Sequence, residues 1–586
     1  MTATAESDAT GTPASTEPSE PSPSNGQTYV ERFPEDARLV RYCFAVSFGA
    51  LGIAGLFGFI QALHRTDTFR GIVSSSDYYT LLSGHGVLMA LVFTTFFISG
   101  LFTWGVSKSL DRSIAGRLGW TWFWTMFAGT VLATVAILGG FFPDLGVNAD
   151  VLFTFYAPMA AHPIFYLGAV LIIVGSWIAG ANYFRAYRRW RRNHSGERIP
   201  LITFMVLTTF LMWYLATLGV AVELLAFLLP WSLGLIETVD PLLTRTLFWY
   251  FGHPVVYFWL LPAYVVWYAI LPKLSGGRLL SDPLARVVFV LLLLLSTPTG
   301  FHHQYVDPGI AEGYKFIAMT NTMFLLLPSL ITAFTVVASM EHGARQRGGT
   351  GYVSWLRKLP WDDPAFVGIA LAGLMFAAGG FSGMVNAGMN LNYLVHNTLW
   401  VPGHFHLTVG TAFALTAMAV TYWLFPQISG KRLQYKTAAL VQPYLWFFGM
   451  TLMSNAMHRA GLAGVPRRTA EPTYADTPAV VFEGIVGGIG EMRLQIALGG
   501  TLLFVSLCLF LWVIGATWLG PRGGQLSVDG VIPPALSGPE AGPRVLDDIR
   551  LWMVIAVVLV LLTYALPLWG LAADGLLSPG SPPIPV

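Results

Sequence analysis

Residues 401–425 read VPGHFHLTVGTAFALTAMAVTYWLF, an apolar run that contains two histidines and a few small residues. About 20 apolar residues suffice for a helix to cross the roughly 30 Å hydrocarbon core of a bilayer. We therefore expect a spanning helix from Tyr393 to Phe425. Ionisable side chains are costly inside such a helix, so the two histidines indicate a functional interior.

The composition of the whole chain is that of a membrane protein. Of its 586 residues, 54% are hydrophobic and only 11% are charged. The net charge of +2 gives no reason to expect a nucleic-acid partner. We expect an all-α polytopic membrane protein embedded in lipid.

About thirteen apolar runs are long enough to span. They form one transmembrane domain, residues 29–575, between a disordered N-terminal tail, residues 1–28, and a short C-terminal tail, residues 576–586. Besides Tyr393–Phe425, the expected spans are Leu39–Leu63, Tyr79–Trp104, Trp120–Phe141, Val151–Phe184, Leu201–Leu229, Leu242–Leu271, Pro283–Phe301, Phe316–Met340, Pro364–Ala378, Ala438–Ala460, Val480–Leu519 and Leu551–Leu571.

Basic residues follow alternate spans, which predicts the orientation of the chain. The loops after the second, fourth, sixth, eighth and tenth spans carry most of the Lys and Arg residues, including Lys108, Arg112 and the group at 185–192. Those loops are expected in the cytoplasm, and the N-terminus with them. Arg467 and Arg468 fall in a loop expected on the outer side of the membrane, where basic residues are disfavoured. We therefore expect an anionic group beside them.

Six of the twelve histidines are expected at one depth, in the outer half of the membrane: His85, His253, His302, His303, His404 and His406. Both cysteines, Cys43 and Cys508, lie in apolar runs, so no thiolate site can be built. A single interior histidine can simply bond a neighbouring carbonyl, but six at one depth indicate a shared metal centre.

Their spacing adds chemical detail. His404 and His406 are two residues apart, so on a helix they point about 200° from each other and can hold one cofactor on each face. His253 and Tyr257 are four apart and share a face. Three imidazoles without carboxylate or thiolate suit copper or zinc, and a redox role favours copper. Axial histidines suit haem iron.

Three motifs carry a family resemblance: WYFGHPVVY at 249–257, GFHHQ at 300–304 and VPGHFH at 401–406. With these motifs the chain resembles subunit I of the haem-copper oxygen reductases, and most closely the B-type cytochrome c oxidases, over nearly all of Arg38–Leu571. The resemblance implies a twelve-helix core plus one helix. It also implies a terminal oxidase that reduces O₂ to water while moving protons across the plasma membrane of a prokaryote.

The resemblance also assigns the cofactors. His85 and His406 would bind a low-spin haem, His404 a high-spin haem, and His253, His302 and His303 one copper ion. The expected types are b for the low-spin haem and a for the high-spin haem, although the sequence leaves both types open. Tyr257 would be the tyrosine that family members cross-link to a copper-binding histidine.

Tyr257 distinguishes oxygen reduction from the nearest rival function. Cleavage of O₂ needs four electrons, and a nearby phenol can lend an electron and a proton. Related nitric oxide reductases lack this tyrosine. A-type oxidases usually carry a Glu where Val255 stands, so we expect no second proton channel. A single path would run through Tyr264, Tyr268, Ser329 and Thr332 to Tyr257, although Ser and Thr in membrane helices often only bond their own backbone.

The outer side carries the residues expected near the haem propionates. Arg467 and Arg468 suit carboxylates, because guanidinium forks pair well with them. His396 and Asn386 match family positions at the high-spin haem, whereas Asn392 stands where close relatives have Asp. That departure puts proton loading there in doubt. Glu223 is either a proton carrier or a neutral hydrogen-bonding acid.

The chain has neither the thiolates nor the soluble domain that a dinuclear copper entry site needs. The resemblance therefore implies a partner subunit II that carries this site, with cytochrome c or a small copper protein as electron donor. The sequence does not exclude a quinol as the electron donor instead. A more distant alternative is a transporter with an intramembrane histidine relay, which would contain no haem and would be expected to show internal repeats.

Overall fold

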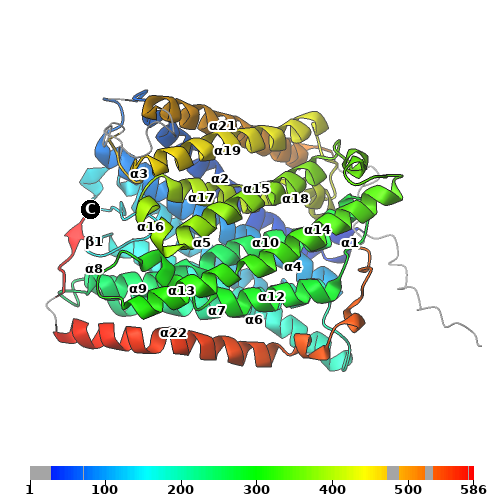
Figure 1. Cartoon of the computed structure of the whole chain (residues 1–586), viewed down its shortest axis with the longest axis horizontal. Coiled ribbons are helices and arrows are strands. Elements are labelled where there is room, and N and C mark those ends of the chain that lie inside the picture. Colours follow the sequence, from blue (N-terminus) through cyan, green and yellow to red (C-terminus); the bar gives the residue numbers. More distant parts are fainter. Residues whose placement is uncertain (1–27, 70, 472–487, 522–531, 578–579) are drawn as a thin grey trace, which may run out of the picture.

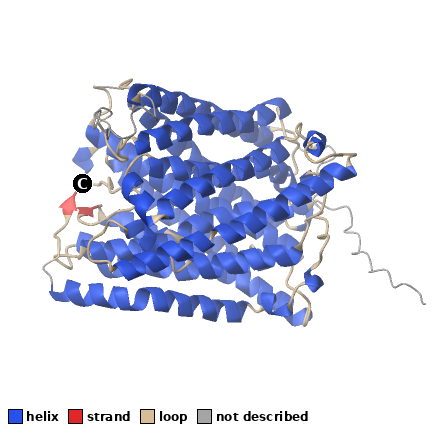
Figure 2. Cartoon of the chain, viewed as in Figure 1, coloured by secondary structure: helices blue, strands red, loops and turns tan. Residues whose placement is uncertain are grey.

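The computed structural model describes residues 28–69, 71–471, 488–521, 532–577 and 580–586. Within these ranges the chain is a bundle of long, roughly parallel helices with almost no strand (Figures 1 and 2). The single sheet pairs β1 (Met159–Ala160) with β2 (Ile584–Pro585) in parallel. The predicted all-α class is confirmed.

Eleven helical segments of the described chain are long and apolar enough to cross a membrane. Several are continuous runs of adjoining elements. They comprise α2 (Pro34–His64), α3–η1–α4 (Ser75–Val87, Leu88–Phe93, Thr94–Ser109), α5 (Gly116–Gly139), α6 (Pro163–Asn193), α7–η3–α8 (Leu201–Val222, Glu223–Leu228, Leu229–Ser232), α9–α10–α11 (Pro241–Gly252, Pro254–Ala269, Leu271–Leu274), α13–α14 (Glu312–Phe324, Leu326–Gln346), α15 (Pro364–Ala387), α17–η6–α18 (Trp400–Leu407, Thr408–Phe413, Ala414–Ser429), α21 (Ile489–Leu519) and α22 (Ile549–Leu577).

Two further expected spans correspond to α12 (Asp282–Ser296) and α19 (Lys436–Leu462), which run alongside the others in Figure 1. At about 1.5 Å per residue, α12 is shorter than the hydrocarbon core. The count of thirteen spans therefore stays a prediction. The remaining elements are short: α1 (Tyr29–Arg32), η2 (Pro143–Leu145), η4 (Gly300–Gln304), η5 (Ser354–Lys358), α16 (Met389–Val395), η7 (Pro539–Ala541) and η8 (Arg544–Asp547).

Two predicted starts are wrong. The span expected from Val151 begins at Pro163, where His162 caps α6 by accepting from the Ile164 amide, and residues 151–162 form turns and β1. The span expected from Tyr393 begins at Trp400, because the chain turns between α16 and α17. The start of the Val480–Leu519 span and residues 1–27 of the N-terminal tail lie outside the described residues.

Three six-residue π-helical turns interrupt spanning helices near the polar interior. They are η1, just after His85, η3, which begins at Glu223, and η6, just after His406. Such turns re-aim side chains and are frequent at functional sites. Two of them, η1 and η6, follow candidate ligands and mark the part of the bundle described next.

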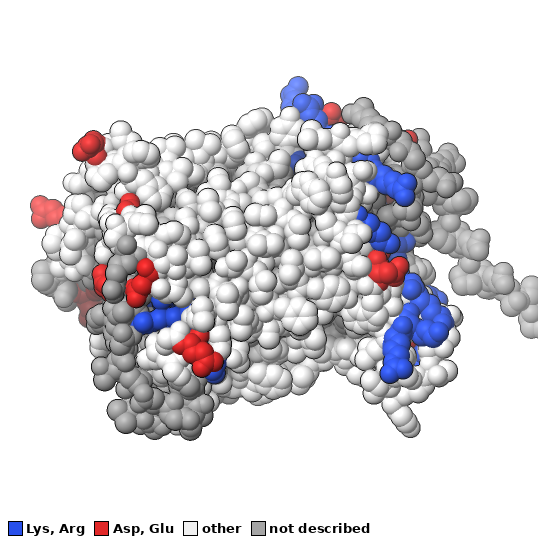
Figure 3. Space-filling view, turned by 90° about the horizontal axis from the view of Figure 1, so that it is seen from above, with Lys and Arg blue, Asp and Glu red and all other residues white. Residues whose placement is uncertain are grey.

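Charge is distributed unevenly along the bundle axis. Figure 3 shows, on the face it presents, most Lys and Arg at one end and most Asp and Glu at the other. The apolar band between the two ends is the surface expected against lipid.

Candidate metal centre

One cavity of about 530 Å³ lies inside the bundle. This volume is within the roughly 300–1,000 Å³ of typical cofactor pockets. All six histidines singled out in the sequence line it, together with Tyr257, Arg467, Arg468, Asn386 and His396. The predicted convergence of the histidines is therefore present in the fold.

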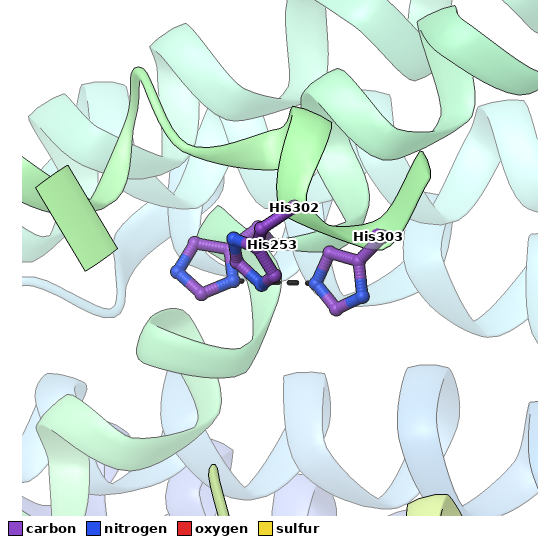
Figure 4. Close-up of side chains that lie close together, drawn as sticks. All are labelled: His253, His302 and His303. Atoms are coloured by element: carbon purple, nitrogen blue, oxygen red, sulfur yellow. Dashed lines mark hydrogen bonds between the residues drawn. The ribbon is translucent and has the colours of Figure 1, made fainter. Parts of the chain in front are cut away.

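Three of these histidines form a compact cluster (Figure 4). The cluster consists of His253, His302 and His303. Each offers one ring nitrogen, and these three nitrogens lie within 4.8 Å of one another. His253 Nδ1 is 3.3 Å from His303 Nε2. His253 ends α9, and the other two lie in η4, so two elements far apart in sequence build the cluster. Three imidazole nitrogens this close can hold one transition-metal ion.

The surroundings orient the rings of this cluster. Thr322 Oγ1 donates to the Ala318 carbonyl at 2.6 Å, so its lone pair can accept from His302 Nδ1 at 3.0 Å. That contact leaves His302 Nε2 free as a ligand. The His303 ring stacks on Trp249, with centroids 3.9 Å apart and planes 10° from parallel. Partners of this kind fix the tautomer and direction of metal-binding histidines.

A second pair of imidazoles faces across the cavity. The His85 and His406 ring centroids are 6.2 Å apart and the planes differ by 13°. His85 Nδ1 lies 2.9 Å from the Ala54 carbonyl, and His406 Nδ1 lies 2.6 Å from the Pro402 carbonyl. Each Nδ1–H can donate to its carbonyl and leave Nε2 free. Two metal–nitrogen bonds of about 2 Å fit one ion between rings at this separation.

His404 turns to the opposite side of α17. Its Nδ1 lies 3.0 Å from both the Gly379 carbonyl and Ser382 Oγ, on α15. A Cβ at Gly383 would stand 2.8 Å from His404 Cε1, so glycine makes room for the ring. The predicted divergence of His404 and His406 is present, and His404 Nε2 is left for a second centre.

The donor set fits haem iron and copper. All six candidates are imidazoles, and four of them, His85, His302, His404 and His406, have Nδ1 engaged by a carbonyl or hydroxyl oxygen. His253 instead turns Nδ1 toward His303 Nε2, 3.3 Å away, and its Nε2 is buried without a hydrogen-bond partner among the described residues. A neutral imidazole with one free ring nitrogen is the usual ligand for these metals.

Tyr257 adjoins the cluster, and a line of hydroxyl groups continues from it. The Tyr257 and His253 ring centroids are 5.0 Å apart. About two turns further along α10, Tyr264 Oη lies 3.3 Å from Ser329 Oγ, and one turn beyond it Tyr268 Oη lies 2.6 Å from Thr332 Oγ1. Ser329 and Thr332 also donate to their own helix. The four predicted path residues thus meet pairwise across α10 and α14.

The other end of the cavity is cationic. Arg467 contacts Asn397 Oδ1 at 2.9 Å, and Arg468 contacts Thr154 Oγ1 at 3.4 Å. Within the described ranges, no ion pair joins either guanidinium to a carboxylate. Burial, and then the charge of its neighbour, lower the pKa of Arg467. An anion between the two would relieve both effects.

Amide groups lie beside these arginines. Within the described part of the chain, the side-chain oxygen and nitrogen of Asn386 are buried without hydrogen-bond partners. His396 Nδ1 lies 3.1 Å from Asn392 Oδ1, and Asn392 Nδ2 donates to the Asn386 carbonyl at 2.7 Å. Burial, and then the charge of Arg467, lower the pKa of His396 to about 4, so this imidazole is neutral at pH 7.

Glu223 lies apart from the cavity lining, fully buried at the start of η3, and neither carboxylate oxygen has a hydrogen-bond partner among the described residues. Sequence reasoning missed Thr322, Ser382 and Trp249, which orient the metal-site histidines. Only Trp249, inside the WYFGHPVVY motif, left a signal in the sequence.

A helical bundle built around imidazole ligands defines a membrane metalloprotein. Comparison with known families narrows the class: the chain belongs to the family Cytochrome C and Quinol oxidase polypeptide I, whose model matches residues 38–492. It is an oxidoreductase, the catalytic subunit of a haem-copper terminal oxidase.

Individual relatives agree with this family. The chain is 42% identical to a cytochrome c oxidase subunit 1 of Thermus thermophilus, over 91% of this chain and 94% of the relative. It is 25% identical to quinol oxidase subunit 1 of Bacillus spizizenii, over 82% and 73% of the two chains. A solved haem-copper terminal oxidase dimer matches with a TM-score of 0.86 and 34% identity, covering 94% and 95%.

Proposed function

We propose that His85 and His406 hold a low-spin haem, His404 holds a high-spin haem, and His253, His302 and His303 hold one copper ion. The observation that carries this proposal is the orientation of the rings. Nδ1 is occupied in His85, His404 and His406 by backbone oxygens, so each can offer Nε2 to iron. His404 and His406 have one residue between them on α17, and they point to opposite faces of this helix, so each can hold a different haem.

When bound, the high-spin haem and the copper ion would supply three of the four electrons that cleave the O–O bond. Tyr257 lies beside His253 and would provide the fourth electron and a proton. The buried Nε2 of His253 has no hydrogen-bond partner, so it is free for the link to Tyr257 that the resemblance implies. This tyrosine favours oxygen over nitric oxide as the substrate.

Protons for this chemistry reach Tyr257 along Tyr268, Thr332, Tyr264 and Ser329. The support is the pair of hydroxyl contacts between α10 and α14. Val255 replaces the carboxylate that would end a second channel, so this single path serves both water formation and proton translocation.

Arg467, Arg468, His396 and Asn386 bind the haem propionates at the outer end of the cavity. Among the described residues, the two guanidiniums have no carboxylate partner and the Asn386 amide makes no hydrogen bond, which matches the needs of carboxylate groups. Because Asn392 cannot ionise, it cannot hold a pumped proton where close relatives have Asp. Glu223 lies outside this path.

The remaining assignments follow the B-type resemblance. The low-spin haem is of b type and the high-spin haem of a type. A subunit II with a dinuclear copper site delivers electrons from cytochrome c or a small copper protein. The N-terminus faces the cytoplasm of a prokaryote, in keeping with the basic loops that gather at one end of the bundle (Figure 3).

A reduced spectrum of the purified complex, before and after carbon monoxide, tests the cofactor assignment. We expect two haems, of which only one shifts, because His85 and His406 would both bind the iron of the other and leave no place on it for carbon monoxide. A spectrum without haem would overturn the proposal. Oxygen uptake in sealed vesicles, with protons released outside beyond those from the donor, tests the translocation.

A further inference from the structure

The C-terminal helix α22 lies at the edge of the bundle, as Figure 1 shows. Only 17% of its most apolar window is buried. The buried side chains form one stripe, Ala556, Val560 and Tyr564, at a spacing of four residues. Tyr564 is only 2% exposed, so this peripheral helix sends one polar side chain into the interior.

The hydroxyl of Tyr564 reaches the loop that carries two of the three clustered histidines. It accepts a hydrogen bond of 2.7 Å from the amide of Gly300. Gly300 begins η4, which contains His302 and His303. Amides at the start of a helix have no partner within it, so Tyr564 satisfies a donor that η4 leaves open.

Gly300 is held tightly between two groups. A Cβ there would lie 2.3 Å from the Trp249 carbonyl oxygen and 2.4 Å from the Tyr564 hydroxyl. The ring of Trp249 stacks on His303. The backbone at Gly300 is therefore fixed by Trp249 on one side and by Tyr564 on the other, and the two histidines follow within three residues.

The Tyr564 ring packs against both segments that supply the cluster. Its centroid is 4.9 Å from Phe301, next to His302, and 4.7 Å from Tyr250, three residues before His253. These rings belong to a small apolar cluster that is separate from the main core and also contains Val560, Ile310 and Ala318. Tyr564 thus connects α9, η4 and α22.

Both ends of α22 are anchored to the bundle, which fixes the direction of Tyr564. Just before the helix, Asp547 pairs with Arg198 at 3.3 Å and with the buried Arg286. Beyond the helix, Ile584 donates to the Pro158 carbonyl at 2.8 Å in the β1–β2 pair. A helix held at both ends can fix the position of a loop that its middle contacts.

We propose that Tyr564 is a positioning residue for the copper-ligand loop: its hydroxyl fixes the Gly300 backbone and so the separation of His302 and His303 from His253. This inference rests on the proposed copper assignment. It gives α22, which lies beyond the matched residues 38–492, a direct role in the stability of the metal centre.

The test replaces Tyr564 with Phe, which keeps the ring and removes only the hydroxyl. The matched control is Thr563→Val on the same helix, because the Thr563 hydroxyl donates to its own helix at Leu559. Copper per haem iron is measured in the purified complexes during dialysis against a copper(I) chelator under reducing conditions. His302→Asn defines the zero for this site. Hydrogen exchange of residues 299–305 is followed in parallel.

We expect Tyr564→Phe to lose the site copper about five- to tenfold faster than the parent, with both haems retained. Direct partners of metal ligands typically cost about 10–100-fold in affinity, and Tyr564 acts one step further away. Exchange in 299–305 should rise while Thr563→Val matches the parent. Unchanged copper loss and exchange in Tyr564→Phe, or equal changes in Thr563→Val, would overturn the inference. A parent complex that holds no copper at this site would instead overturn the copper assignment.

Discussion

The imidazole rings of His85 and His406 face each other across the cavity, with centroids 6.2 Å apart and planes 13° from parallel. They come from α3 and α17, two helices far apart in the chain. Each ring has Nδ1 against a backbone carbonyl. The two Nε2 atoms are thus left for one metal between them, and the low-spin haem assignment depends on this relationship.

His85→Ala should remove the six-coordinate haem spectrum and leave the carbon monoxide-binding haem intact. The substitution leaves a cavity beside Gly58, which packs closely against the His85 ring because it has no side chain. Free imidazole should bind in this cavity. Added imidazole is then expected to restore the low-spin absorption band. His162→Ala, at the outer cap of α6, is the control and should leave both spectra unchanged. Loss of the carbon monoxide-binding haem instead would reverse the assignment.

Tyr257→Phe should lower oxygen reduction by at least about 100-fold with both haems and the copper still bound, because positioned proton donors contribute roughly 10²–10⁴-fold. Oxygen uptake and the haem spectrum are measured on the same preparation. Near-normal uptake in this variant would show that the phenol takes no part in cleavage of the O–O bond.

Thr332→Val should slow turnover about tenfold, since it removes the hydroxyl that contacts Tyr268 at 2.6 Å. Thr335, one turn along α14, has a buried hydroxyl with no hydrogen-bond partner in the described ranges, and Thr335→Val is the matched control. The slower rate should carry a larger solvent isotope effect than the parent. Equal rates in the two variants would argue against a proton path through Thr332.

Arg467→Gln should lower the midpoint potential of a haem, because a positive charge near the propionates favours the reduced form. A shift on the order of 50 mV corresponds to about 1 kcal/mol of Coulomb energy. Redox titration of the two haems measures it, with Arg432→Gln in the loop after α18 as control. A potential that does not move would place the propionates elsewhere.

The candidate metal-binding histidines show which features of the site can be predicted from the sequence and which cannot. The spacing of His404 and His406 is enough to predict their opposite directions, because a helix fixes that angle. That His253 lies close to His302 and His303 could be predicted because all three are expected at the same depth in the membrane. The contacts of Ser382 and Thr322 could not be predicted, since they join helices whose rotation is set by packing. Tyr564 escaped prediction for the same reason.

The two wrong helix starts have a similar origin. Residues 151–161 are apolar enough to continue a span, yet they form turns, where the Leu152 amide donates to Ser83 and the Asp150 carboxylate accepts from Thr80. Hydropathy indicates that a segment is apolar enough to be buried, but it does not show whether the segment continues the helix or turns away from it. Only the His162–Pro163 pair, with proline suited to the first turn of a helix, marked the true start of α6.

The central claim, a haem iron on His404 facing a copper ion on the three-histidine cluster, is tested most directly by infrared spectroscopy of the reduced, carbon monoxide-bound complex. Carbon monoxide is released from the iron by light at low temperature. We predict that it moves to the copper and gives a second, copper-type stretching band, which His302→Asn abolishes. Direct return to the iron in the parent complex, with no second band, would contradict the account.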